Sequence, residues 1–261
     1  MSNSWKYIII ISASLIADYC LSCQCHNYTE ENIGTNDCTH KDQSSLNNDI
    51  PAPPSTDNSK RLEAAQTLAA NLDEAVKLTG MYTALANQVK SKTGSNNDHS
   101  FIGIAGMQNA LRSETSGGNL SKFKKWAEEG SWKSFHNEHY DWWMFPLDQN
   151  TASKGMKYTV FADQIKELKK DNAYLKDYRL GVILLMMSWG WDMKNQCFYN
   201  DPGNQQAWTG YQVRLGKLAY SLILFQQWDL YESVEKFVLF LKDNKGFVKS
   251  DHYVKTSFPN I

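Results

Sequence analysis

Apolar side chains recur at helical spacing through most of the chain beyond residue 60, and alternating strand patterns are scarce. The first such segment carries one apolar stripe with steps of three and four residues, formed by Leu62, Ala65, Ala69, Leu72 and Val76. Ser59 precedes this stripe and is a residue type that caps helix N-termini. We therefore expect a helix that begins just after Ser59.

Stripes of the same spacing follow in the second half of the chain and predict the principal helices. They run through residues 158–168, 175–189, 208–225 and 230–241. A shorter helix is expected over 101–112. Residues 182–187 are apolar on every side, which marks their helix as the central one, and Gly190 is placed to end it. The pattern predicts an all-α fold, an irregular bundle of about five to seven helices with an aromatic interior.

The N-terminus has the form of a secretory signal peptide. Lys6 precedes a run of apolar and small residues, Tyr7–Ala17, that is too short for a membrane span of roughly 20 residues. We assign residues 1–23 to this signal, with an uncleaved anchor or a buried first strand as the alternatives. The expected location is secreted or in the cell envelope, either periplasmic or membrane-anchored.

The end of this segment carries a candidate lipidation site at Cys23. Small Ser22 stands directly before it, as in bacterial lipoprotein processing sites, whereas Cys20 and Leu21 depart from the usual pattern. Acyl chains on Cys23 would tether the mature protein. Contact with a membrane is expected only through the signal or this anchor.

A polar segment follows the signal. Residues 24–59 are dominated by Asn, Asp, Thr, Ser, Glu and Pro, and end near the run Pro51-Ala52-Pro53-Pro54. This composition buries too little apolar surface to offset the entropy of ordering, so we expect a disordered linker that its prolines stiffen. The helical domain then spans residues 60–261.

The charge balance limits the classes of partner. The 261 residues include 27 Lys+Arg and 28 Asp+Glu, which gives a formal net charge of -1. This balance provides no basic field for nucleic acid. The basic cluster of Lys122, Lys124 and Lys125 is followed by Glu128 and Glu129, whose negative charges balance most of it. This pattern is typical of a solvated helix face. We expect one folded domain and no nucleic-acid partner.

The densest group of unusual residues is the run Trp132–Asp148, which combines histidines with aromatic side chains. Together with a tryptophan at the end of the central helix, it forms the candidate surface for a protein or peptide partner. The candidate binding residues are His136, His139, Tyr140, Trp142, Trp143 and Trp191. The alternative is that these aromatics pack a helix end or the core.

A metal site is a second hypothesis for the same run. On one helix His136 and His139 would share a face, and Asp141 would complete a divalent metal site. A metal-dependent hydrolase would then use Glu138 or Asp141 as its base. The spacing differs from the His-Glu-x-x-His motif of zinc proteases, and the leading expectation is that no metal is bound.

The cysteines are unevenly placed. Cys20, Cys23, Cys25 and Cys38 crowd the N-terminal region, and Cys197 stands alone in the helical part. Their spacing differs from that of zinc knuckles, so a metal cluster is disfavoured. In an oxidising compartment we expect disulfides among the cysteines that remain after processing.

Signatures of catalysis are missing from the sequence. It has no Gly-x-Ser-x-Gly elbow, no phosphate-binding loop and no glycine pattern of dinucleotide-binding proteins. Cys197 lacks the flanking residues of thiol proteases. We expect no catalytic residue and no cofactor, and the metal-dependent hydrolase is kept as the alternative.

The run His139–Leu147 resembles the His-x-Tyr-hydrophobic-x-Trp-hydrophobic-Phe-Pro-Leu signature of the opioid growth factor receptor conserved region. The segment Tyr178–Met193, which ends in Trp-Gly-Trp-Asp, is similar to the next core helix of that family. Arg214–Leu222 and Val238–Leu241 resemble its closing helix pair. The resemblance covers about residues 135–243 and implies a helical binding module without established catalytic residues.

Overall fold

The computed structural model describes residues 56–112 and 119–261, and this part of the chain is mostly helical. It contains 12 helices, seven of them substantial, and one pair of short strands. The predicted all-α class is therefore confirmed. The predicted signal peptide with Cys23, and the predicted linker up to residue 55, lie outside the described residues.

The helices differ widely in length. The substantial ones are α2 (Thr56–Ala70), α5 (Gly103–Arg112), α6 (Asn119–Glu129), α9 (Ala162–Leu168), α10 (Asn172–Ser188), α11 (Gln212–Phe225) and α12 (Trp228–Lys245). The short ones are α3 (Glu74–Lys77), α4 (Thr83–Gln88), α7 (Ser134–Asn137), α8 (Asp141–Met144) and α13 (His252–Ser257). After α10, strands β1 (Trp191–Asp192) and β2 (Cys197–Phe198) form an antiparallel pair.

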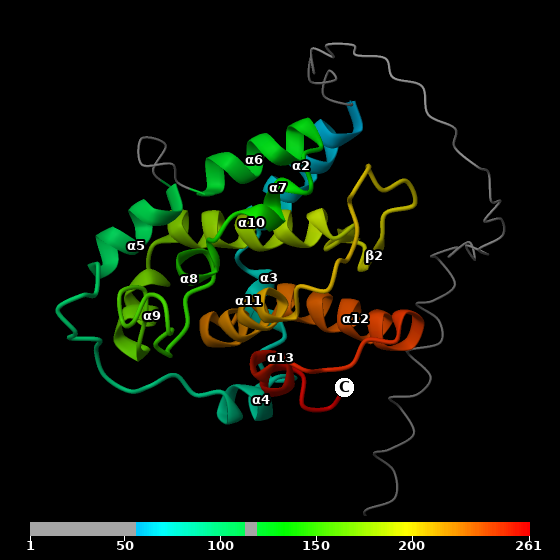
Figure 1. The fold of residues 1–261 in the computed structure, drawn as a ribbon. Coiled ribbons are helices and arrows are strands. Elements are labelled where there is room, and N and C mark those ends of the chain that lie inside the picture. The colour runs from blue at the N-terminus through cyan, green and yellow to red at the C-terminus, as the bar shows by residue number, and fades with distance from the viewer. Residues whose placement is uncertain (1–55, 113–118) are drawn as a thin grey trace, which may run out of the picture. The chain divides into compact units, whose positions relative to one another are not determined.

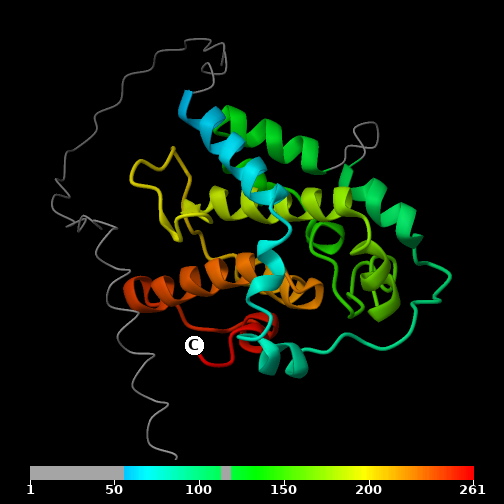
Figure 2. The same ribbon diagram turned by 180° about the vertical axis from the view of Figure 1, so that it is seen from behind.

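Helix α10 lies at the centre of the described fold, as its apolar sequence predicts. The carboxylate of Asp171 caps its N-terminus by accepting hydrogen bonds from the backbone N–H groups of Ala173 and Tyr174. Every residue of the helix from Tyr178 onward is buried. Helices α2 and α6 lie on one side of α10, and α11 and α12 lie on the other (Figures 1 and 2). Gly190, with φ 81°, follows the helix end in a left-handed conformation.

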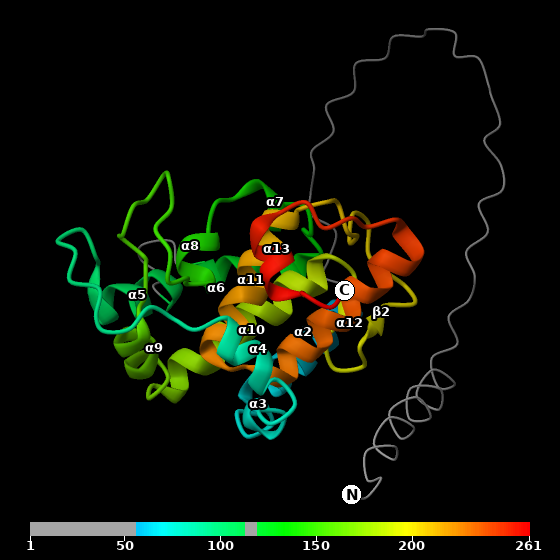
Figure 3. The ribbon, with the colours of Figure 1, turned by 90° about the horizontal axis from the view of Figure 1, so that it is seen from below.

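Helix α13 packs closely against α11, as Figure 3 shows from below. Gly216 permits this approach, because a Cβ atom there would lie 2.7 Å from both the Asp251 carboxylate and the backbone nitrogen of Val254. The close packing brings the start of α13 beside the start of α11.

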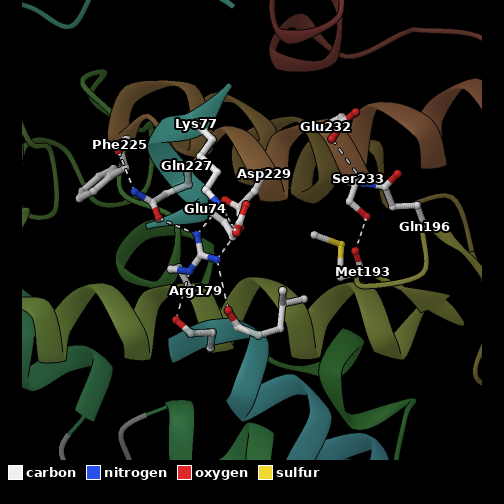
Figure 4. Close-up of polar contacts among 12 residues, drawn as sticks. Glu74, Lys77, Arg179, Met193, Gln196, Phe225, Gln227, Asp229, Glu232 and Ser233 are labelled. Carbon is white, nitrogen blue, oxygen red and sulfur yellow. Dashed lines mark hydrogen bonds and ion pairs between the residues drawn. The ribbon is translucent and has the colours of Figure 1, made fainter. Parts of the chain in front are cut away.

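A buried arginine joins α10 to two other parts of the fold (Figure 4). Arg179 is fully buried, and its guanidinium pairs with both carboxylate oxygens of Asp229, at 2.9 and 2.6 Å. It also donates to the backbone carbonyls of Leu68 and Ala69 and to the side-chain oxygen of Gln227. The C-terminus of α2 and the N-terminus of α12 are thus held by one side chain.

Several expected helix boundaries are wrong. Helix α2 begins at Thr56, so Ser59 lies inside the helix and is not its N-cap. The chain leaves the helical path after Ala70, which places Val76 in the separate helix α3. Trp208 precedes α11, because Gly210 adopts a left-handed turn with φ 88° before the helix starts. The spacing also misjudged burial at these ends, because Val76 is 64% exposed and Trp208 is only partly buried.

Candidate functional site

The predicted binding run folds into two short helices instead of one. Helix α7 ends at Asn137 and α8 begins at Asp141, so His139 lies in the connecting segment. His136 and His139 therefore do not share a helix face, which is the arrangement that the metal hypothesis assumed. The packing also divides the run into a core part and a surface part.

Two of the predicted binding residues lie in the core. Tyr140 is 0% exposed, and its hydroxyl donates to the carbonyl of Phe135 at 2.7 Å. Trp191 is 2% exposed, and its indole N–H donates to the hydroxyl of Ser233 at 3.0 Å. The hydroxyl of Ser233 in turn donates to the carbonyl of Met193 (Figure 4). The rings of Tyr140 and Trp191 are not available to a partner.

Three other predicted residues keep accessible surface. His139 is exposed, and Trp142 and Trp143 are partly buried. The ring centroids of His139 and Trp142 are 6.1 Å apart, as are those of Trp142 and Trp143. These rings lie side by side along the link and the start of α8.

A buried ion network lies beneath the run. Asp141 accepts from the Arg214 guanidinium at 3.2 Å through one carboxylate oxygen, and from the Lys217 ammonium at 3.1 Å through the other. The three residues are 7–8% exposed. Arg214 also donates to the carbonyls of Phe135 and Glu138, which fixes the link between α7 and α8 on α11. Such a network is stable only because each charge has a partner.

An open depression of about 450 Å³ lies above this network, where α11 starts. Its lining residues come from α8, α11 and the segment leading into α13: Asp141, Gly210, Tyr211, Gln212, Val213, Arg214, Ser250 and Asp251. Tyr211 is 38% exposed and Val213 is 51% exposed. Val248, which is 74% exposed, accepts a hydrogen bond at its carbonyl from the Gln212 side chain. Two exposed side chains with apolar surface, Tyr211 and Val213, therefore line the depression.

A column of stacked rings leads from the depression into the core. Tyr211 stacks on His136 at a centroid distance of 4.7 Å, and His136 stacks on Trp189 at 6.0 Å. Trp189 stacks in turn on Phe237 at 6.1 Å, and both of these rings are fully buried. The Arg214 guanidinium lies 5.3 Å from the centre of the Tyr211 ring. The exposed tyrosine thus rests on a rigid support.

The electrostatics of the column keep its histidine neutral. Burial, and then the positive charge of Arg214, lower the pKa of His136 from 6.5 to about 4. The Nδ1 atom of His136 is buried and forms no hydrogen bond with the described residues. At neutral pH this ring is an uncharged stacking partner for Tyr211.

A serine next to His136 does not have the geometry of a nucleophile. The Ser188 hydroxyl lies 3.5 Å from His136 Nε2, but Ser188 is 0% exposed. Its hydroxyl donates to the carbonyl of Leu185 at 2.6 Å. A nucleophilic serine must face the substrate and give its proton to the base, and Ser188 does neither.

The described residues also give no support to metal binding by His136, His139 and Asp141. Within residues 56–112 and 119–261, no three His, Cys, Asp or Glu side chains are grouped as metal ligands. The physical reason is plain, because His136 is stacked between rings and both oxygens of Asp141 are taken by cations. Of the cysteines, only Cys197 lies in the described part, where it is partly buried in β2.

The two cations of the buried network were not predicted as site residues. Arg214 stands out in the sequence only through the family resemblance, and Lys217 does not stand out in it. Both stand among apolar residues of a strongly hydrophobic helix, at a spacing of three residues that places them on one face. Charged residues inside an apolar stripe are the signal that would have identified them.

Comparisons with known proteins identify no relative. No family model, no curated protein and no solved structure matches this chain. The similarity to the opioid growth factor receptor conserved region therefore stays a sequence-based expectation. In the described part of the chain, no helix combines the length and apolarity needed to cross a membrane.

Proposed function

We propose that this protein is a helical binding module that recognises a protein or peptide partner at the depression beside the start of α11. One observation carries the proposal: exposed Tyr211 and Val213 stand over a buried, hydrogen-bonded pair of Asp141 and Arg214. Tyrosine and arginine are both enriched at the energetic centre of protein interfaces.

The chemistry of the depression favours a peptide segment with an apolar side chain. Tyr211 and Val213 offer apolar surface at the rim. Arg214 lines the depression and uses three of its five N–H groups on Asp141 and on two backbone carbonyls, which leaves no more than two donors for a carbonyl of the partner. A volume of about 450 Å³ lies within the usual range for ligand sites.

The predicted residues support this surface in different ways. His136 backs Tyr211, and Tyr140 positions Arg214, whose guanidinium lies 4.6 Å from the centre of the Tyr140 ring. Trp142 flanks the buried ion network, because the Lys217 ammonium lies 5.0 Å from its ring centre. Within the proposal, the run therefore contributes mostly by supporting the site.

We also propose, on the sequence alone, that the module is exported. The charged start and the apolar run Tyr7–Ala17 support a signal, and Cys23 is the candidate lipid anchor. The polar segment 24–55 would display the helical bundle away from that end.

Selection of displayed random peptides on the full-length protein tests the binding proposal. We expect enriched peptides that carry apolar residues, and we expect the double variant Tyr211→Ser, Val213→Ser to weaken their binding about tenfold. Both side chains are exposed, so the variant should fold normally.

The matched control is Val76→Ser, since Val76 is 64% exposed and lies outside the depression. Peptides that bind the double variant as well as they bind the original chain would show that the depression is not the binding site.

A further inference from the structure

A second surface lies next to the depression and is built from other side chains. We call Trp142, Trp143 and Tyr158 the aromatic row, since their ring centroids follow one another at 6.1 and 5.1 Å. All three residues are partly buried and so leave part of each ring open to a partner. Trp142 and Tyr158 also line a shallow hollow of about 10 Å³, which is too small for a separate ligand. The row is therefore a contact surface.

Two lysines extend over the row. The Lys154 ammonium lies 5.2 Å from the centre of the Trp142 ring, and the Lys157 ammonium lies 5.3 Å from the centre of the Tyr158 ring. Both lysines are exposed. Among the described residues, no carboxylate forms an ion pair with either of them. Each ammonium is held above a ring with its charge uncompensated.

Two carboxylates that lie close to Trp142 and Trp143 along the chain, those of Asp141 and Asp148, are already engaged. Asp141 is taken by Arg214 and Lys217, as described above. Asp148 is 3% exposed, and one of its oxygens accepts from the backbone N–H of Lys92 at 3.0 Å. Burial also raises the pKa of Asp148 above its usual range. The row therefore presents exposed positive charge on a chain whose net charge is -1.

From this arrangement we propose that the aromatic row, with Lys154 and Lys157, is a docking surface for an acidic peptide segment of a partner protein. Carboxylates of the segment would pair with the two ammonium groups, and its apolar side chains would pack on the open parts of the rings. None of these residues lines the depression at α11, so this proposal and the proposed function can fail separately.

Other anionic partners fit the surface less well. Two lysines neutralise too few phosphates for useful affinity to nucleic acid, whose binding rests on many such contacts. A membrane contact requires apolar side chains that penetrate about 5–10 Å below the headgroups, and these rings are partly buried in the fold.

Fluorescence anisotropy with a defined probe tests the proposal. The probe is a labelled synthetic peptide of alternating glutamate and leucine, mixed with the full-length protein at low salt. We expect this peptide to bind about tenfold more tightly than its glutamine–leucine counterpart, because only the first carries charge. We expect Lys154→Gln with Lys157→Gln to remove most of that difference, and Lys154→Arg with Lys157→Arg to retain it.

Lys176→Gln with Lys245→Gln is the matched control, because it removes the same charge at two exposed sites on α10 and α12. Equal binding of the two peptides, or equal loss in the control variant, would overturn the proposal. Tighter binding to duplex DNA or to phosphatidylserine vesicles, lost in the glutamine variant, would also overturn it and would identify the other class of partner.

Discussion

Arg179 in α10 and Arg214 in α11 are both buried, but their surroundings differ. Arg179 is 0% exposed, and its guanidinium pairs with both carboxylate oxygens of Asp229. Arg214 is 7% exposed, borders an open depression and shares Asp141 with Lys217. The first arginine is enclosed and joins helices, whereas the second supports a surface. The same residue type on neighbouring helices thus serves stability in one place and, in our proposal, recognition in the other.

Loss of the enclosed arginine should have the largest effect. Arg179→Met leaves Asp229 without its cation and the carbonyls of Leu68 and Ala69 without their donor. We expect the free energy of unfolding to fall by about 3–5 kcal/mol, as measured by urea denaturation. Lys176→Met, at an exposed position of the same helix, should change it by less than about 0.5 kcal/mol. A similar small change in both variants would show that Arg179 does not hold the fold.

The network at the depression should tolerate damage better. Asp141→Asn leaves Arg214 and Lys217 facing a neutral amide, and we expect a loss of about 2–3 kcal/mol. Because both cations are then buried without a carboxylate, adding Lys217→Met removes one uncompensated charge and should restore part of this loss. Purely additive losses in the double variant, measured by the same denaturation, would contradict the shared-carboxylate arrangement.

The smallest expected effect concerns pH. The pKa of His136 is lowered from 6.5 to about 4 by burial and by Arg214, so on acidification the unfolded chain binds the proton first. Above pH 6.5 His136 is neutral in both the folded and the unfolded chain, so its titration does not lower stability. As the pH falls from 6.5 toward 4, protonation of the unfolded chain lowers the free energy of unfolding. Since the ring is only partly buried, we expect a loss of about 1 kcal/mol.

The control for this prediction is His136→Gln, which removes the titrating group. Urea midpoints at pH 7 and at pH near 4 should fall less in the variant than in the original chain. Equal changes in the two chains would mean that the pKa of His136 is the same in the folded and the unfolded chain, so that burial does not lower it.

The sequence was sufficient to predict the elements whose burial is nearly complete. Residues 182–187 are apolar all round and lie in the central helix, which ends before Gly190. The stripe of 230–241 lies within α12. In these segments the apolar spacing predicted the helix correctly, because the core-facing residues all belong to one continuous helix.

The candidate site was only partly predictable. Asp141 lies 73 residues before Arg214 and 76 before Lys217, and periodicity reports which face is buried but not which distant residue it meets. The link between α7 and α8 also separates neighbours in the run. Tyr140 turns into the core while His139 stays exposed, although the two are adjacent in the sequence.

The clamps on α2 have a mechanical consequence. A force applied to the chain before Thr56 acts first on helix α2, which is the first helix of the described residues. Near its start, Arg61 binds the side chain of Asp201, and at its end Arg179 holds the carbonyls of Leu68 and Ala69. A stretched molecule would meet these two anchors in succession, so its force–extension curve should show a weak yield at Arg61 followed by a stronger one at Arg179.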